Sequence, residues 1–242
     1  MFLCTFVLAF MLCPSRISSI PIEATSSAKT KDPKSDIQNL VSRLSNYQNC
    51  QIINYSVPFN GISGLTVPNN ERVSRISVGR GIQNYTCTQG NYVSAGALAN
   101  LFDVSCVYTM SANIIDSKTV DKLLPQVAYS ALSYPYSGQL PIAIHHEFVD
   151  TPGSSTAGSI SPKFYTSIGT ENVIVKKING VNDPINPSIN VPWLQLGALE
   201  NQGTLSKSVF RLNTYKGQPP SSCTKEGEQL SVEYAAMYWF TK

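Results

Sequence analysis

The chain carries little charge and very little histidine. Of its 242 residues only 14% are Asp, Glu, Lys or Arg, the formal net charge is +3, and there are two histidines. Binding to nucleic acid needs clustered Lys and Arg, so this balance argues against a nucleic-acid partner. No apolar run is long enough to cross a bilayer as a helix, so no membrane span is expected.

Several catalytic and cofactor motifs are missing as well. The sequence has no Cys-x-x-Cys pair, as a zinc knuckle or a thioredoxin-type site would need, and no Gly-x-Ser-x-Gly elbow of a serine hydrolase. Gly79-Arg-Gly-Ile-Gln-Asn84 comes close to a dinucleotide fingerprint, but Asn84 replaces the third glycine and a strand-like segment follows. We interpret it as a tight turn between two strands. No cofactor and no metal ion is predicted.

The N-terminus has the pattern of an export signal. Phe2–Cys13 is apolar apart from Thr5, is too short to span a bilayer, and is followed by Pro14. We predict a cleavable signal peptide over residues 1–19, a flexible polar arm over residues 20–35, and a single β-rich domain over residues 36–242. The protein is therefore expected to be secreted and extracellular.

Export places the remaining cysteines and the sequons in an oxidising compartment. Asn54-Tyr-Ser56 and Asn84-Tyr-Thr86 are N-glycosylation sequons, so the chain is predicted to be a glycoprotein with glycans on Asn54 and Asn84. An even number of cysteines follows the predicted leader, which indicates two disulfide bonds with the pairing left open. These cysteines are Cys50, Cys87, Cys106 and Cys223.

Most of the chain after Cys50 has the patterns of strands and turns. Residues 230–240 alternate, with apolar side chains on one face and Trp239 on the other, and a β-branched run over residues 172–178 precedes the turn pair Asn179-Gly180. Helical spacing occurs at residues 37–44 and after Ser117, where Pro125 is expected to limit the helix. These patterns predict a mainly β fold, either an antiparallel β-sandwich or an open barrel, with one or two short helices.

The two histidines are adjacent, in the segment His145-His146-Glu147. Neighbours on a strand point to opposite faces, so His146 shares the apolar face and is most simply a hydrogen-bonded core residue. On the other face, His145 with Glu147 or Asp150 can act as an acid–base pair or supply two metal ligands, although a third ligand must come from elsewhere. His145, His146, Glu147 and Asp150 are therefore the catalytic candidates of one hypothesis.

Aromatic side chains are the candidates of a second hypothesis. On an extracellular β surface they can stack on sugars or on a partner protein. Large aromatic residues are usually buried, however, so we favour the interpretation that most of them belong to the core or lie half-buried under loops. The residues concerned are Tyr92, Tyr134, Tyr136, Trp193 and Trp239.

Six segments resemble a known set of motifs in the same order. They are Val78–Cys87 (resembling GRGTQNYTC), Ala95–Cys106 (GALATLYDASC), His145–Phe148 (HHYF), Val191–Leu196 (VPWLKL), Val209–Cys223 (VYRVNTAGGSAPATC) and Val232–Phe240 (VQYAAEYWFY). Together they resemble one family of secreted fungal proteins of unknown function, which has bacterial relatives and whose members are often labelled malate dehydrogenase.

The resemblance covers about Val78 to Phe240 and implies a secreted setting, but it supplies no catalytic residues. Glu147 departs from the motif, which has an aromatic residue there. Bacterial relatives that keep only cysteines matching Cys87 and Cys223 imply that these two pair, which leaves Cys50 with Cys106. The missing dinucleotide motif and the predicted export argue against the malate dehydrogenase label.

The favoured hypothesis is a secreted, non-catalytic protein that works at a cell surface or a host interface, with a glycan, a cell-wall component or a host protein as its partner. The alternative is an extracellular hydrolase or metal-dependent enzyme that uses the two histidines, and a true malate dehydrogenase ranks last. An enzyme should show a histidine at the floor of a cleft with a carboxylate or serine within reach. A binding protein should show an open face and histidines away from it.

Overall fold

The computed structural model describes residues 50–112, 116–138 and 140–242. The predicted signal peptide, the polar arm and the helix expected at residues 37–44 lie outside the described residues. Within the described ranges, no helix is both long enough and apolar enough to cross a membrane.

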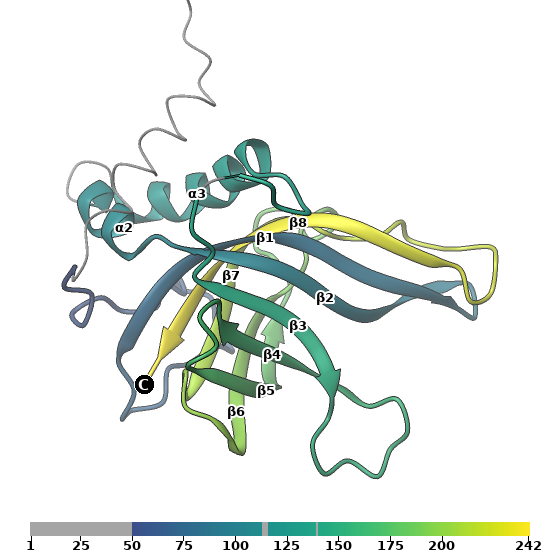
Figure 1. Cartoon of the computed structure of the whole chain (residues 1–242). Coiled ribbons are helices and arrows are strands. Elements are labelled where there is room, and N and C mark those ends of the chain that lie inside the picture. The colour runs from purple at the N-terminus through teal and green to yellow at the C-terminus, as the bar shows by residue number, and fades with distance from the viewer. Residues whose placement is uncertain (1–49, 113–115, 139) are drawn as a thin grey trace, which may run out of the picture. The chain divides into compact units, whose positions relative to one another are not determined.

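Eight antiparallel strands form a closed barrel, in which each strand pairs with the next and β1 pairs with β8 (Figure 1). A mainly β, antiparallel fold is thereby confirmed, and the sheet closes on itself where a sandwich or an open barrel was expected. Closure leaves the sheet without a free first or last strand. The strands are β1 (Val73–Thr88), β2 (Asn91–Asp103), β3 (Ile144–Asp150), β4 (Ile160–Thr166), β5 (Asn172–Val181), β6 (Trp193–Gly203), β7 (Ser208–Lys216) and β8 (Gln229–Thr241).

Strands β1, β2 and β8 extend past the rest of the barrel as a three-stranded ribbon (Figure 1). β1 pairs with β8 from Val73 to Thr86, whereas β2 pairs with β3 only over Ala99–Leu101. Cys87, near the end of β1, is joined to Cys223 of the loop before β8. This disulfide connects the ribbon to the β7–β8 loop.

The core has two parts, one inside the barrel and one outside it. The inner part contains the alternating apolar residues of β8, Tyr234, Ala236, Tyr238 and Phe240, as the sequence pattern predicts. The outer part lies between the barrel and two helices, α2 (Ser105–Ala112) and α3 (Ser117–Ala131), and includes Trp239. Both faces of β8 are therefore buried along most of its length.

The segment expected to be a tight turn is instead the middle of β1. Gly79 and Gly81 lie within the continuous strand Val73–Thr88. A Cβ atom on Gly79 would lie 2.5 Å from the Tyr238 ring, and one on Gly81 would lie 2.0 Å from the Leu98 carbonyl oxygen. The glycines thus allow close packing against neighbouring strands, which is a role of strand glycines other than turning.

Two further expectations about element ends are wrong. α3 continues through Pro125 to Ala131, because its buried residues Val120 and Ala128 pack on the barrel and offset the one backbone hydrogen bond that proline removes. Asn179-Gly180 is not a hairpin turn but lies inside β5, beside a register shift between Lys177 and Asn179. In both cases long-range packing overrides a local signal.

The four cysteines form two disulfide bonds. Cys50 pairs with Cys106, at the start of α2, and Cys87 pairs with Cys223. These are the pairs that the family resemblance implies. The first bond fastens the segment before β1 to a helix, and the second closes a loop with a sequence separation of 136 residues.

Candidate functional site

The two histidines lie on β3, and His146 is a core residue. It is buried, its Nδ1 lies 3.1 Å from the backbone oxygen of Lys163, and its ring stacks on Phe164 with 4.3 Å between the ring centroids. Burial lowers the pKa of His146 from 6.5 to about 4. The imidazole is therefore neutral at neutral pH and is held by packing.

His145 points to the other face and has no acidic partner among the described residues. Its Nδ1 lies 3.0 Å from the Asn100 side-chain oxygen, and its ring stacks on Tyr165. Glu147, two residues on, pairs with Lys163 at 3.6 Å, and Asp150 is exposed at the end of β3. The structure brings the candidates onto one strand, and within residues 50–112, 116–138 and 140–242 neither histidine is paired with a carboxylate or a hydroxyl group.

Metal binding at these residues finds no added support in the described part of the chain. There, no three His, Cys, Asp or Glu side chains come together as they would around a metal ion. The hydrolase hypothesis accordingly stays a prediction that depends on His145.

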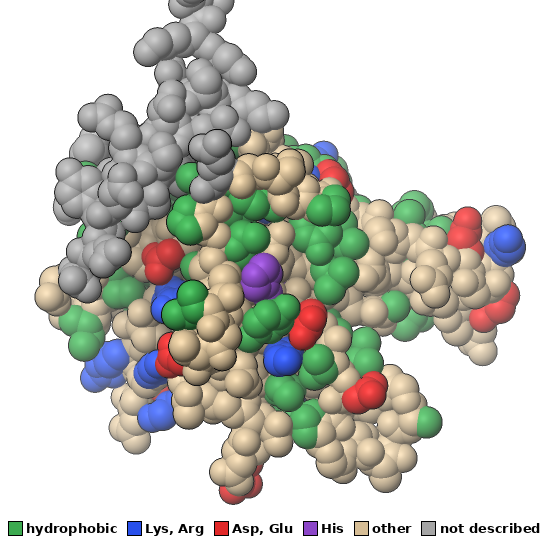
Figure 2. All heavy atoms as spheres, in the orientation of Figure 1, with side chains coloured by type: hydrophobic (Ala, Val, Ile, Leu, Met, Phe, Trp, Pro, Cys, Tyr) green, Lys and Arg blue, Asp and Glu red, His purple; other side chains and the backbone are tan. Residues whose placement is uncertain are grey.

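The aromatic candidates differ in how far they are buried. Trp193 and Trp239 are 1% and 0% exposed and belong to the outer core. Tyr92, Tyr134 and Tyr136 are half-buried, and Tyr136 packs edge-on against Phe102. No broad aromatic platform results from these five residues. On the face shown in Figure 2, charges of both signs are interspersed, with no large patch of a single sign.

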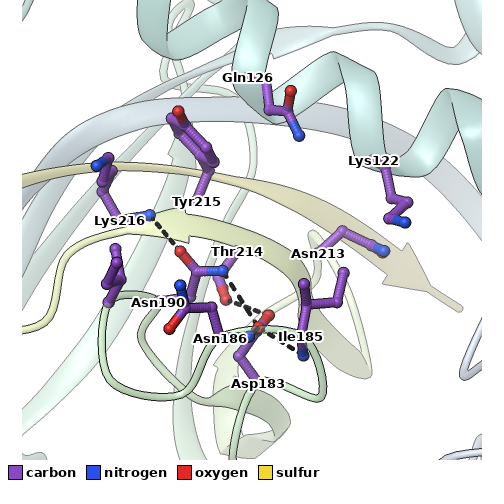
Figure 3. Close-up of a pocket in the computed structure, with 11 residues that line it drawn as sticks. Lys122, Gln126, Asp183, Ile185, Asn186, Asn190, Asn213, Thr214, Tyr215 and Lys216 are labelled. Carbon is purple, nitrogen blue, oxygen red and sulfur yellow. Dashed lines mark hydrogen bonds between the residues drawn. The ribbon is translucent and has the colours of Figure 1, made fainter.

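A polar pocket with a volume of about 440 Å³ lies between α3, the loop over residues 182–190 and the end of β7 (Figure 3). Its volume falls within the range of small-ligand sites. Neither histidine lines it. Its lining residues are Lys122, Gln126, Asp183, Ile185, Asn186, Ile189, Asn190, Asn213, Thr214, Tyr215 and Lys216.

Asp183 organises the back wall of this polar pocket. It is 2% exposed, and five donor groups lie within hydrogen-bond distance of its oxygens, the Thr214 hydroxyl sharing its one proton with the Val191 carbonyl oxygen. The donors are the backbone nitrogens of Ile185 (3.0 Å) and Asn186 (2.7 Å), Nδ2 of Asn190 (3.1 Å), Nε1 of Trp193 (2.9 Å) and Oγ1 of Thr214 (3.2 Å). A carboxylate with this many partners is a structural anchor and not a free base.

The polar side chains next to Asp183 also form hydrogen bonds within the protein. The side-chain oxygen of Asn190 accepts the backbone nitrogen of Lys216 at 2.8 Å, and Thr214 donates to the Val191 carbonyl oxygen at 2.6 Å. The side-chain oxygen of Asn186 accepts the Ser188 hydroxyl at 2.8 Å. These bonds fasten the 182–190 loop to β7, so the pocket wall is preorganised.

A bulge in β7 shapes the opposite wall. The register with β8 shifts between Leu212 and Tyr215, and Asn213 and Lys216 have positive φ angles of 48° and 67°. Asn213 is 8% exposed, and its side-chain oxygen is buried without a hydrogen-bond partner among the described residues. In Figure 3 the Asn213 amide and the Lys122 side chain point toward the same part of the pocket.

The polar pocket is not evident from the sequence. Its residues come from α3, from a loop that the sequence marks only as a turn, and from the bulge in β7. Two of the segments that resemble the family motifs contribute to the pocket. Val191–Leu196 contains Trp193, which bonds to Asp183, and Val209–Cys223 contains the lining residues Asn213 and Thr214.

Both predicted glycosylation sites are described. Asn54 is exposed and borders a second pocket, of about 590 Å³. Asn84 is half-buried on β1, where its side-chain oxygen accepts the Ser231 hydroxyl at 2.7 Å. Nδ2 of Asn84, the atom that a glycan would modify, makes no hydrogen bond of its own in the described chain.

Comparison with known proteins gives a family but no activity. A family model with the description "Protein of unknown function (DUF3455)" matches residues 68–242, which include strands β1 to β8, helices α2 and α3 and the polar pocket. No curated protein and no solved structure matches the chain.

Proposed function

We propose a function from the polar pocket itself, because the chain belongs to the family described as "Protein of unknown function (DUF3455)" and this family gives no activity. The protein acts as a secreted, non-catalytic binding protein, and the pocket holds part of a glycan or cell-wall component. The observation that carries this proposal is a preorganised pocket whose wall combines free amide groups with apolar side chains.

Carbohydrate recognition suits the chemistry of this wall. The amide groups of Gln126 and Asn186 can bond to ring hydroxyls, and Ile185, Ile189 and Tyr215 offer apolar surface to the C–H face of a sugar ring. The absence of a free carboxylate beside a histidine at the pocket favours binding over hydrolysis. Among the residues that line it, Asp183 carries the only carboxylate, and that group has five partners.

A glycan array probed with the disulfide-intact protein tests this function. We expect one class of glycan to be enriched, and Asn186→Ala to weaken binding by about fivefold through loss of one hydrogen bond. The backbone nitrogen of Asn186, which bonds to Asp183, is retained in this variant. Lys118→Gln is the matched control, because Lys118 lies on α3 but does not line the pocket. Absence of any enriched glycan, or equal binding by Asn186→Ala, would contradict the proposal.

Secretion is supported by the two disulfides and by the exposed sequon at Asn54. Expressed from its full sequence in a eukaryotic host, the protein should accumulate in the medium and lose mass on treatment with an N-glycosidase. Asn54→Gln and Asn84→Gln should each remove one glycan. Retention inside the cell, or an unchanged mass after treatment, would count against this part of the proposal.

The hydrolase alternative depends on one half-buried imidazole. Of the two histidines only His145 is not buried, and its partner is the amide of Asn100. If the protein hydrolysed a glycan, His145→Ala should abolish the activity. Glycan binding that is unchanged in His145→Ala, with no product formed by either protein, would favour the binding function.

A further inference from the structure

We infer that the polar pocket recognises a carboxylate, so that its ligand is an acidic sugar, a uronic acid residue within a glycan. This inference rests on the proposed function and specifies its substrate class. The observation that carries it is that Lys122 and Lys216 line the pocket and form no ion pair among the described residues.

Some hydrogen-bond acceptors of the wall are used within the protein, whereas the Asn213 side-chain oxygen is buried without a partner among the described residues. Both oxygens of Asp183 are occupied, and the side-chain oxygens of Asn186 and Asn190 each accept one protein donor. The Thr214 hydroxyl proton is directed at Val191 and Asp183. The side-chain oxygens of Asn213 and Gln126 remain available to O–H groups of a ligand, so the preference for an anion comes from the lysines of the wall.

Several hydrogen-bond donors of the pocket wall have no partner among the described residues. Lys122 and Lys216 form no ion pair in the described part of the chain, whereas Lys163 and Lys242 are paired with glutamates. The side-chain nitrogen of Asn186 makes no hydrogen bond there either. A wall rich in free N–H groups matches a ligand that only accepts, and an ionised carboxylate is such a group.

The charged groups that line the pocket also favour an anionic ligand. Two ammonium groups line the pocket against the one carboxylate of Asp183, which lies buried at the back within hydrogen-bond distance of five uncharged donor groups. Figure 3 shows Lys122 and Lys216 at opposite ends of the pocket, with Asn213 beside Lys122. An anionic group between them gains Coulomb attraction that a neutral sugar does not.

The volume and the apolar residues favour a sugar acid over a free inorganic anion. A pocket of about 440 Å³ holds far more than one phosphate ion, and Ile185 and Ile189, which are 61% and 41% exposed, can contact a sugar ring. The carboxylate would lie against Lys122 and Asn213, and the ring would lie against the 182–190 loop.

Calorimetric titration with trigalacturonate, galactotriose and inorganic phosphate tests the inference. Trigalacturonate should bind at least about tenfold more tightly than galactotriose, and 0.5 M NaCl should weaken its binding selectively, because salt screens exposed charges. Lys122→Gln and Lys216→Gln should each reduce trigalacturonate affinity about fivefold and reduce galactotriose affinity less. Lys118→Gln should change neither affinity.

The possible results separate this inference from the proposed function. Equal binding of galactotriose and trigalacturonate, or no effect of the two lysine variants, would overturn the acidic-sugar inference and leave glycan binding intact. Binding of phosphate with no preference for trigalacturonate would also overturn it, since the pocket would then recognise any anion. Failure of every glycan to bind would overturn both. A thermal melt of each variant confirms that it is folded.

Discussion

Two buried titratable side chains respond to pH in opposite directions. Burial lowers the pKa of His146 from 6.5 to about 4. Asp121, on α3, is 0% exposed and has one oxygen 3.4 Å from the Tyr108 hydroxyl and the other without a partner among the described residues. Burial raises the pKa of Asp121 from 3.8 to about 7.

The free energy of unfolding depends on pH through both His146 and Asp121, and replacing either residue should reveal the contribution of the other. Between pH 4 and 6.5 the unfolded chain binds more protons at His146, so stability rises with pH there. Between pH 3.8 and 7 the folded chain binds more protons at Asp121, so that contribution falls as pH rises. In the wild type the two largely cancel.

Urea denaturation from pH 4 to 6.5, followed by tryptophan fluorescence, measures both slopes. Asp121→Asn should become more stable toward pH 6.5 by about 3 kcal/mol, the value of the His146 pKa shift. His146→Gln should instead become less stable over the same range. Parallel pH profiles for the two variants would contradict these assignments.

The alternation of apolar and polar residues predicts on which face of the sheet a side chain lies. It does not predict what packs against that face. The sequence placed His146 with the apolar residues and Trp239 opposite Tyr238, and both placements hold. The pattern could not show that α2 and α3 cover the outer face, which buries Trp239. It also could not show that Asp183, Thr214 and Lys122, which are far apart in the chain, meet at one pocket.

At the scale of elements, β1 depends on its two glycines. Gly81→Ala should lower the free energy of unfolding by at least about 2 kcal/mol, because a Cβ atom there would lie 2.0 Å from backbone and no rotamer change can relieve that contact. Thr88→Ala, at the exposed end of the same strand, is the control and should stay within about 0.5 kcal/mol of the wild type. Equal stability of the two variants would show that β1 and β2 can separate without cost.

Element ends were predicted less well than element types. A mainly β chain with a helix after Ser117 was expected and is observed. Pro125, Asn179-Gly180 and the glycines of β1 are strong local signals for a break, yet each lies inside a helix or a strand. The contacts that sustain these elements come from distant segments, which local patterns do not contain.

At the scale of the whole molecule, the two disulfides should contribute unequally. Loop-closure entropy assigns about 5 kcal/mol to the Cys87–Cys223 bond, with a sequence separation of 136, and about 4 kcal/mol to the Cys50–Cys106 bond, with a separation of 56. The Cys87→Ala/Cys223→Ala variant should therefore unfold at lower denaturant than Cys50→Ala/Cys106→Ala. A loss below about 1 kcal/mol for the first variant would show that the barrel constrains that loop without the bond.

Closure of the barrel could not have been predicted from the sequence. Alternation shows that β1 and β8 are strands, but their pairing joins Val73 to Thr241 across nearly the whole described chain. A sandwich or an open sheet satisfies the same pattern of apolar residues. Only the long-range register distinguishes these architectures.

The β1–β8 pairing has a consequence for the timing of folding. β1 cannot gain its second partner until β8, more than 140 residues later, has been synthesised and has reached it. Until then the inner residues of β1 and β2 are exposed to water, and joining such distant strands makes folding slow. A chain of this kind stays vulnerable to aggregation and proteolysis through most of its synthesis, and it would benefit from chaperones that bind nascent hydrophobic strands.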